Sequence, residues 1–414
     1  MDSFFNVKTP QEVFRIIEHF GPSGEETVSL EDSLGRILAR DIISDEDLPH
    51  FSRSVVDGFA VRAKDTFGAS ESLPAFFEIA GEVQMGQSPA VTVAEGQAVR
   101  ISTGGMLPEG TDGAVMIEHC MAMEENTIAV SRPISPLENI IQPGDDFKRG
   151  ESVINHGHCL RPQDLGVLAG LGKGEIPVFK KPRVAIISTG DEIVSIDEHP
   201  APGQVRDINS YTLAAFCRRN GAEPLHIGLC SDSFDTLKKL AEEGLNRADT
   251  VWISGGSSVG TRDLTLKVFE TLADFSLLVH GISISPGKPT IIGISGSIPV
   301  IGLPGHVASA LVVADVFLTP LLFRLSGRSY FSGVQQPQAE AILARNIESA
   351  SGREDYIRVR LIREPEGLIA EPIFGKSGLI STLVEADGLV RVDMNTEGLY
   401  KGQLVKVLLT GGMI

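Results

Sequence analysis

The sequence has few cysteines, too little positive charge to balance its acids, and no long uninterrupted hydrophobic run. Its 414 residues include 4 Cys, and 36 Lys plus Arg stand against 54 Asp plus Glu, for a formal net charge of −18. Four scattered cysteines without a C-x-x-C pair exclude a disulfide framework and a thiolate metal site. The acidic balance argues against non-specific binding to nucleic acid or to anionic membranes, because a basic face supplies most of that attraction.

The most apolar segment is too short and too interrupted to be read as a membrane span. Residues 307–323 are nearly all apolar, but Asp315 lies in the middle and Pro320 follows. The run also falls short of the roughly 20 residues that cross a bilayer, so we predict a buried core helix. The first residues, MDSFF, carry no basic region and no apolar stretch of the kind found in signal peptides. We therefore expect a cytoplasmic protein.

The length predicts several domains, and 42% hydrophobic against 22% charged residues indicates packed cores. Thr9, Pro10 and Glu12 carry the signature of a helix start, and Gly21-Pro22 ends that helix. A second helix is predicted at about 29–40. A third, over 162–172, is expected to pack on the first. These segments predict a helical N-terminal or linker domain made of 1–43 and 146–179.

The remaining sequence divides into three further parts. Short strands punctuated by Gly and Pro predict a β-rich insertion domain over 44–145. Apolar strands alternate with helical stretches over 180–328, which predicts an α/β domain with a doubly wound, mostly parallel sheet covered on both faces. Alternating patterns and no long helix predict a small β-barrel over 329–414.

Polar and charged residues follow four of the predicted strands of the α/β domain. Ligands of doubly wound sheets bind beyond the carboxyl ends of the strands, so we expect these loops to form one site. Glycines let backbone N–H groups approach a phosphate, and carboxylates suit Mg²⁺. The candidate residues in these loops are Gly190, Asp191, Glu192, Asp232, Ser254, Gly255, Gly256, Ser257, Ser258, Gly260, Asp263, Pro304, Gly305 and His306. Lys288, in a Ser-Pro-Gly-Lys-Pro loop, is a candidate contact for an oxyanion.

Structural roles remain open for several of these residues. Asp232 and Asp263 could each cap the helix that follows, and Lys288 could be a solvated surface charge. Neither G-x-G-x-x-G nor G-x-x-x-x-G-K-[ST] occurs, so the ordinary dinucleotide and P-loop sites lack support. In the β-rich part, residues 54–58 and 102–105 are, by composition alone, more typical of tight turns than of a site.

Six sequence motifs, taken in their order along the chain, indicate a resemblance to a known protein family. They are SVVDGFAVRAKD at 54–65, ISTGGMLPEGTDGAVMIEH at 101–119, STGDE at 188–192, SGGSSVG at 254–260, SPGKP at 285–289 and GLPGH at 302–306. With them the chain resembles the MoeA-type molybdopterin molybdenumtransferases, the family that includes the gephyrin E domain. The resemblance covers essentially the whole chain.

The resemblance implies insertion of molybdate into adenylylated molybdopterin with release of AMP, in molybdenum cofactor biosynthesis. It also implies a Mg²⁺-dependent homodimer, with each active site between the α/β domain of one subunit and the β-rich domain of the other. An adenylyltransferase that supplies the pterin is an implied partner. Carried over by position, Asp57, Thr103, Asp146, Glu192 and Asp263 fall on catalytic positions. Asp232 and Asp263 fall on metal positions.

The same resemblance places the SGGSSVG loop, Lys288 and the Pro304-Gly305 turn at the pterin and oxyanion. The chain departs from the family pattern at Arg206, at Ser257 and at His306-Val307. Two other functions therefore stay open beside the molybdenumtransferase. One is molybdopterin adenylylation, since small adenylyltransferases share the α/β domain. The other is a non-catalytic binding or scaffold paralogue.

Overall fold

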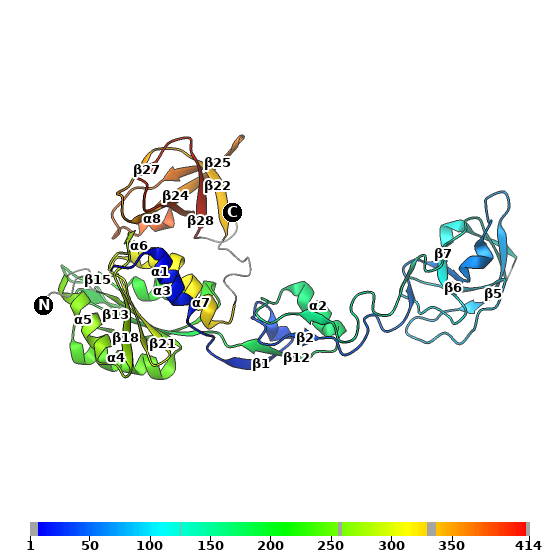
Figure 1. Cartoon of the computed structure of the whole chain (residues 1–414), viewed down its shortest axis with the longest axis horizontal. Coiled ribbons are helices and arrows are strands. Elements are labelled where there is room, and N and C mark those ends of the chain that lie inside the picture. The colour runs from blue at the N-terminus through cyan, green and yellow to red at the C-terminus, as the bar shows by residue number, and fades with distance from the viewer. Residues whose placement is uncertain (1–6, 125, 256–258, 329–336, 411–414) are drawn as a thin grey trace. The chain divides into compact units, whose positions relative to one another are not determined.

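The computed structural model describes residues 7–124, 126–255, 259–328 and 337–410, without the side chains of Glu124 and of 259–263. The chain divides into two compact units (Figure 1). The first, here called the α/β–barrel unit, comprises Met1–Ala39, Gly157–Arg161 and Glu175–Ile414. The second, the β-rich unit, comprises Arg40–His156 and Pro162–Gly174.

A six-stranded sheet forms the centre of the α/β–barrel unit. In sheet order its strands are β16 (Glu223–Cys230), β13 (Arg183–Thr189), β17 (Thr250–Gly255), β21 (Ile298–Leu303), β20 (Ile291–Ser295) and β18 (Phe275–His280). The pairings from β16 through β21 are parallel, and those of β20 and β18 are antiparallel. The predicted parallel core is confirmed, and β18 is a strand that the sequence analysis missed.

Helices cover both faces of this sheet because its strands are apolar on both sides. On β13, Val184 and Ile186 belong to a core shared with α3 (Asn209–Arg219) and the helix at 307–325. The intervening Ala185 and Ile187 belong to a second core, shared with α4 (Phe234–Arg247) and α5 (Val259–Glu270). The strand thus alternates between two cores, as the doubly wound prediction requires.

The apolar segment that was predicted to be a core helix is one. It runs as α6 (Val307–Val313), a π-helical turn (Ala314–Leu318) and α7 (Thr319–Leu325). Within the described residues it alone has the length and composition of a membrane span, but 83% of it is buried inside the protein. The π turn precedes Pro320, and such bulges accommodate the hydrogen bond that proline removes.

The N-terminal segment contains one predicted helix and lacks the other. In α1 (Pro10–Glu18), Thr9 and Glu12 form the expected capping box. This helix packs on α7 and the π turn, where the rings of Phe14 and Phe317 lie 5.2 Å apart. The segment 162–172, on which this helix was expected to pack, belongs to the other compact unit.

The helix predicted at about 29–40 is wrong. The chain there forms β1 (Glu25–Ser29), a short 3₁₀ turn (Glu31–Ser33) and then an extended stretch. Strand β1 pairs with β12 (Glu175–Phe179), far away in the sequence, and its Val28 lies opposite the buried Ile176. At Gly35 the backbone has φ +72°, which a continuous right-handed helix does not allow. A non-local partner thus overrides the local helical pattern.

The β-rich unit is built on a second six-stranded sheet. Its strands, in order, are β7 (Gly113–Met116), β4 (Gly58–Val61), β6 (Gln97–Ile101), β5 (Ala75–Glu82), β9 (Thr127–Val130) and β8 (Cys120–Glu124). Central strand β4 is buried on both sides: Phe59 faces one apolar core and Ala60 another. Two small pairings, β3 (Arg53–Ser54) with β10 (Ile140–Ile141) and β2 (Ile42–Ile43) with β11 (Ser152–Ile154), and helix α2 (Pro162–Gly170) complete the described part.

The C-terminal part is a closed five-stranded barrel, as predicted. The ring runs β24 (Glu354–Glu364), β25 (Gly367–Pro372), β22 (Gln338–Leu343), β28 (Leu404–Leu409), β26 (Gly388–Val392) and back to β24. Valines and small residues from these strands fill its interior. The two-residue strand β19 (Ile284–Ser285), which belongs to the α/β part of the chain, pairs with β24 at Glu354 and Asp355.

Candidate functional site

The loops that follow β13 and β16 are joined at the carboxyl edge of the α/β sheet. The Thr189 hydroxyl donates a hydrogen bond of 2.9 Å to Asp232 Oδ1. The backbone N–H of Asp232 donates one of 3.0 Å to Asp191 Oδ1. A helix-capping role for Asp232 was open from the sequence, but the cap position of α4 is Ser233, and Ser233 makes no capping side-chain bond. Asp232 therefore belongs to the loop cluster.

Negative charge accumulates in this cluster. The pKa of Asp232 is raised, chiefly by burial of its half-exposed carboxyl and further by the charges of Asp191 and Glu192, while the Thr189 hydrogen bond lowers it. A divalent cation would relieve that repulsion. No three or more His, Cys, Asp or Glu side chains in the described residues come together as a complete metal shell. Mg²⁺ needs only one or two carboxylates with water and phosphate oxygens, so this donor set fits it.

Strands β13 and β17 approach each other so closely at this edge that only glycine fits. A Cβ on Gly255 would lie 2.2 Å from the Thr189 carbonyl oxygen. Beneath the edge, the buried Ser188 hydroxyl lies 3.1 Å from Asp207 Oδ1 and 3.3 Å from the Ser254 hydroxyl. Ser254, predicted to contact the substrate, thus forms part of the buried support under the loops.

Two further predicted loops adjoin β19 and α6. The Ser-Pro-Gly-Lys-Pro loop begins at the end of β19, and the turn at Pro304, Gly305 and His306 precedes α6. In the Ser-Pro-Gly-Lys-Pro loop Lys288 is exposed, and its carbonyl accepts a hydrogen bond of 2.9 Å from Ile282. Gly287 has φ +116° and is buried, and a Cβ there would lie 2.6 Å from Val313. This close packing against the last residue of α6 holds the loop while the Lys288 side chain stays in solvent.

The turn at Pro304, Gly305 and His306 is tied to two other elements. Asn209 at the start of α3 donates through Nδ2 to the Gly305 carbonyl at 2.9 Å, while its Oδ1 is buried without a partner. The His306 ring nitrogen Nδ1 lies 2.9 Å from the Ser377 hydroxyl of the barrel. The barrel therefore contributes to this edge, and no pattern in the sequence pointed to Asn209 or Ser377.

Some predicted residues lie outside the described part of the chain. They are Gly256, Ser257 and Ser258, together with the side chain of Asp263. The backbone of Gly260 and Asp263 belongs to α5, which begins at Val259. Asp263 is thus inside the helix, and the alternative that it caps that helix is wrong.

The β-rich unit brings its two candidate turns together. Asp57 Oδ1 accepts hydrogen bonds from the Thr103 backbone N–H at 2.8 Å and from the Thr103 hydroxyl at 3.1 Å. Backbone bonds between Ser54 and the 104–105 turn fasten the two loops. A Cβ on Gly58 would lie 1.9 Å from the Val115 carbonyl oxygen, so the chain needs glycine there. The two turns that composition alone assigned to structure thus form one exposed Asp–Thr pair.

Asp146, the third candidate of this unit, lies on a different loop. Its carboxyl is exposed, and its backbone N–H donates to the Leu48 carbonyl at 3.0 Å. The described contacts of Asp146 are made with this neighbouring loop, so its catalytic assignment rests on the resemblance alone.

Comparison with known proteins decides the family. Three family models match the chain: the MoeA N-terminal region (domains I and II) at residues 8–172, a probable molybdopterin binding domain at 185–324, and the MoeA C-terminal region (domain IV) at 340–410. The molybdopterin molybdenumtransferase of Bacillus subtilis is 33% identical over 96% of this chain and 93% of its own length. The chain belongs to the MoeA family.

Other MoeA relatives are similar to this chain over comparable lengths. The molybdopterin molybdenumtransferase of Haemophilus influenzae is 32% identical over 93% of this chain and 94% of its own. Two solved MoeA structures from Pyrococcus horikoshii superpose with a TM-score of 0.84 each, at 37% and 30% identity. They cover 99% and 98% of this chain and 100% of theirs. The resemblance drawn from six motifs is confirmed.

Proposed function

We propose that this MoeA-family protein is a molybdopterin molybdenumtransferase, which inserts molybdate into adenylylated molybdopterin and releases AMP. The observation that carries the proposal is the gathering of the STGDE and GLPGH loops, and of the SPGKP loop that leads into β20, at one sheet edge, in a chain that matches MoeA proteins along its whole length. Sheet edges of this kind are the usual place for anionic ligands in doubly wound folds.

The residues at this edge can perform three tasks. The exposed Lys288 supplies a positive charge for the oxyanion, and its glycine-proline loop fixes where that charge stands. Asp232, held by Thr189, together with Asp191 or Glu192 would bind Mg²⁺. When bound, Mg²⁺ supplies charge neutralisation at the phosphoryl oxygens. Holding molybdate and pterin side by side provides proximity, which accounts for much of the rate in such transfers.

The remaining parts of the proposal rest on the family resemblance. We place the protein in the cytoplasm as a homodimer that accepts its pterin from a molybdopterin adenylyltransferase. Asp57 with Thr103, and Asp146, would supply polar groups from the β-rich unit, and Asp263 would supply a further metal ligand.

The decisive measurement is AMP release from adenylylated molybdopterin in the presence of molybdate and Mg²⁺. We expect AMP and molybdenum cofactor in equal amounts, with none formed when Mg²⁺ is chelated. A chain that instead forms adenylylated pterin from molybdopterin and ATP would be an adenylyltransferase. Tight binding of adenylylated pterin without AMP release would identify a non-catalytic paralogue. Repeating the assay with tungstate would establish the preferred oxyanion.

A further inference from the structure

A basic pocket lies at the opposite end of the α/β sheet from the candidate site. Its volume is about 360 Å³, and it is formed where the chain enters β13 and where it turns from α3 into β16. The candidate site lies at the carboxyl ends of the same strands. Since β13 has 7 residues, the pocket and the site are separated by roughly 20 Å of strand.

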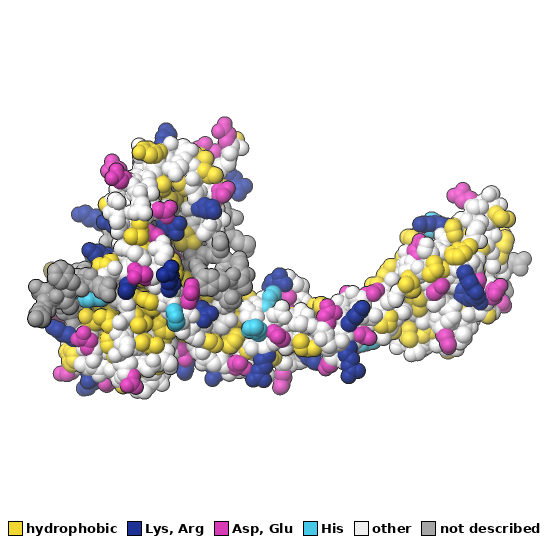
Figure 2. Space-filling view, in the orientation of Figure 1, with side chains coloured by type: hydrophobic (Ala, Val, Ile, Leu, Met, Phe, Trp, Pro, Cys, Tyr) yellow, Lys and Arg dark blue, Asp and Glu magenta, His cyan; other side chains and the backbone are white. Residues whose placement is uncertain are grey.

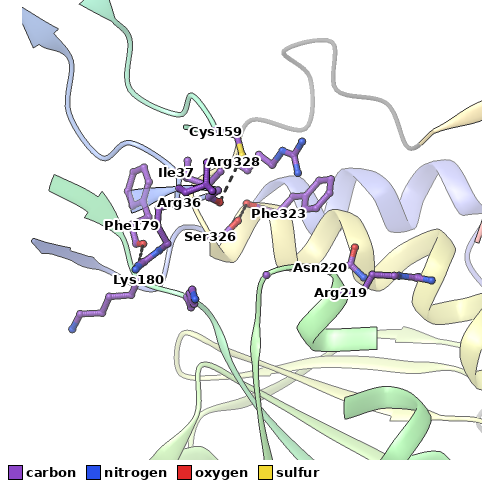
Figure 3. A pocket seen from close by; sticks show the side chains of 14 residues that line it. Arg36, Ile37, Cys159, Phe179, Lys180, Arg219, Asn220, Phe323, Ser326 and Arg328 are labelled. Carbon is purple, nitrogen blue, oxygen red and sulfur yellow. Dashed lines mark hydrogen bonds between the residues drawn. The ribbon is translucent and has the colours of Figure 1, made fainter. Parts of the chain in front are cut away.

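Five cationic residues and no Asp or Glu are among those that line the pocket. They are Arg36, Lys180, Lys181, Arg219 and Arg328. Figure 3 shows Arg36, Cys159 and Ser326 gathered closely, whereas the side chains of Arg219 and Lys180 extend away from them. A lining with cationic residues and no acidic ones contrasts with the face seen in Figure 2, where acidic and basic side chains are interspersed, and with the formal charge of −18 for the chain.

Two of the five cations already have carboxylate partners. Arg36 pairs with Glu26 and also donates to the Phe179 carbonyl at 2.8 Å. Arg219 pairs with Asp315. Among the described residues, no carboxylate forms an ion pair with Lys180, Lys181 or Arg328. Three cationic residues of the lining thus form no ion pair within the described part of the chain.

Helix ends explain only part of this charge. Helices α3 and α7 end beside the pocket, and cations near helix C-termini stabilise the helix dipole. That role suffices for Arg219, the last residue of α3. It does not account for Lys180 and Lys181, which precede a strand and gain nothing from a helix end.

Arg328 carries the most specific indication of a ligand. Its guanidinium lies over the Phe323 ring, 4.4 Å from the centroid, which holds the group in place. Its Nε is buried and has no hydrogen-bond partner. A buried donor without an acceptor is costly, and native structures satisfy nearly all of them. An oxygen of a bound anion would satisfy this one.

We infer that this pocket binds a small molecule bearing phosphate groups, at a site separate from the molybdate and pterin edge. Arginine and lysine together suit phosphate oxygens, Arg through fixed N–H groups and Lys as a point charge. The volume lies at the lower end of the range for small-molecule pockets, which suits a diphosphate or a compact phosphate ester. Cys159, half-exposed in the wall, gives the pocket a chemical reporter.

The test uses pyrophosphate as the probe and the full chain as the protein. Binding is measured by titration calorimetry, and the alkylation rates of Cys159 and of Cys120, half-exposed in the β-rich unit, are followed by peptide mass spectrometry. We expect pyrophosphate to slow Cys159 alkylation at least fivefold and to leave Cys120 unchanged. KCl at matched ionic strength should protect neither. The Arg328→Gln variant should bind about tenfold more weakly, since it loses a charge-assisted hydrogen bond.

A matched control separates this pocket from the candidate site. Lys288→Gln removes a cation at the other end of the sheet and should leave Cys159 protection as in the wild type. If Arg328→Gln lowers the unfolding temperature, the exposed Lys181→Gln provides the same test without a folding defect. Unchanged Cys159 alkylation at saturating pyrophosphate would overturn the inference. So would binding that Lys288→Gln abolishes and the two pocket variants leave intact.

Discussion

The candidate residues of the β-rich unit and those of the α/β sheet edge each include a threonine hydroxyl that donates a hydrogen bond to an aspartate, but the two aspartates differ in their surroundings. In the β-rich unit the Thr103 hydroxyl donates to Asp57 at 3.1 Å, and at the α/β sheet edge the Thr189 hydroxyl donates to Asp232 at 2.9 Å. Asp57 is exposed and receives a second bond from the Thr103 N–H. Asp232 is half-buried, and its pKa is raised first by that burial and then by the charges of neighbouring carboxylates.

The difference indicates two tasks for one chemical pair. Two donors from a single residue fix the direction in which the Asp57 carboxyl points, while water screens its charge. Asp232 lies among like charges, whose repulsion a bound cation would relieve. The contacts of the first pair fix the orientation of a carboxylate, and those of the second lie in a region of accumulated negative charge.

The largest effect is expected when either aspartate is removed. Asp57→Ala and Asp232→Ala should each lower AMP release by roughly a hundredfold, the usual cost of losing a positioning group, with little change in unfolding temperature. If one site takes Asp57 and Asp232 from different subunits, as the family resemblance implies, refolding the two variants together restores activity. Random mixing makes half the dimers mixed, each with one intact site, so recovery should approach about a quarter of wild type.

Two results would contradict this arrangement. Mixed dimers confirmed by mass but without recovered activity would show that both aspartates act within one subunit. A strong loss of stability in either variant would show that the carboxylate serves the fold and does not serve the reaction.

The backbone beside Asp57 is tightly enclosed, as it is at Gly255 beside Thr189, and Gly58→Ala tests this enclosure in the β-rich unit. The added Cβ meets the Val115 carbonyl at 1.9 Å, so we expect a loss of about 3 kcal/mol in the stability of the β-rich unit. Hydrogen exchange measured on peptides from each unit would localise the change. Gly166→Ala in α2 of the same unit is the control, because a Cβ there meets nothing within 4 Å. It should stabilise by about 0.5–1 kcal/mol.

A smaller effect is expected from Thr189→Val, which tests how the hydrogen bond from Thr189 affects the charge of Asp232. The hydroxyl of Thr189 lowers the pKa of Asp232, so its removal should raise that pKa further. More Asp232 is then protonated at a given acidic pH, and the acid limb of the activity profile moves to higher pH. Activity at alkaline pH should stay near that of wild type. Thr189→Ser keeps the donor and should leave the limb unmoved; a shift with serine as well would refute the assignment.

The smallest effect is expected for the stability contribution of Asp315, a buried carboxylate that, unlike Asp232, forms an ion pair with an arginine. Burial raises the pKa of Asp315 to about 6, although Arg219 at 2.6 Å opposes the shift. Because Arg219 stabilises only the charged form, Arg219→Gln should destabilise more at pH 8 than at pH 5. We expect a difference of about 1 kcal/mol, since this arginine is half-exposed. Urea unfolding at both pH values measures it, and Arg218→Gln on the same helix end should show no such difference.

Local sequence patterns predicted what local physics determines. The capping box of α1, the strand-end loops and the buried helix at 307–325 all depend on neighbours in the sequence. The helix expected at 29–40 was wrong because β1 pairs with a strand that lies beyond 170 in the sequence. Strand β18 was missed because a short apolar run fits helix and strand equally well.

In the candidate site, too, contacts that follow from local patterns were predicted, and contacts between distant segments were not predicted from the residues themselves. Asp191 and Asp232 were placed together from the rule for parallel sheets, and the structure joins them. The Asp57–Thr103 pair came from the family resemblance, because 46 residues separate the two. The contact of His306 with Ser377 joins segments 71 residues apart, and no periodicity or spacing encodes it.

The pairing of β19 with β24 limits how this protein can be recombined. Ile284 and Ser285, at the start of the Ser-Pro-Gly-Lys-Pro loop, add a strand to the barrel at Glu354 and Asp355. Gln11 of α1 donates a hydrogen bond of 3.2 Å to the Glu354 carboxyl. An exchange of residues 337–410 for a foreign barrel would therefore remove a strand partner from the lysine loop and an anchor from the first helix. The barrel is not an interchangeable module, and chimeras should retain activity only when β24 and the 283–289 loop are inherited together.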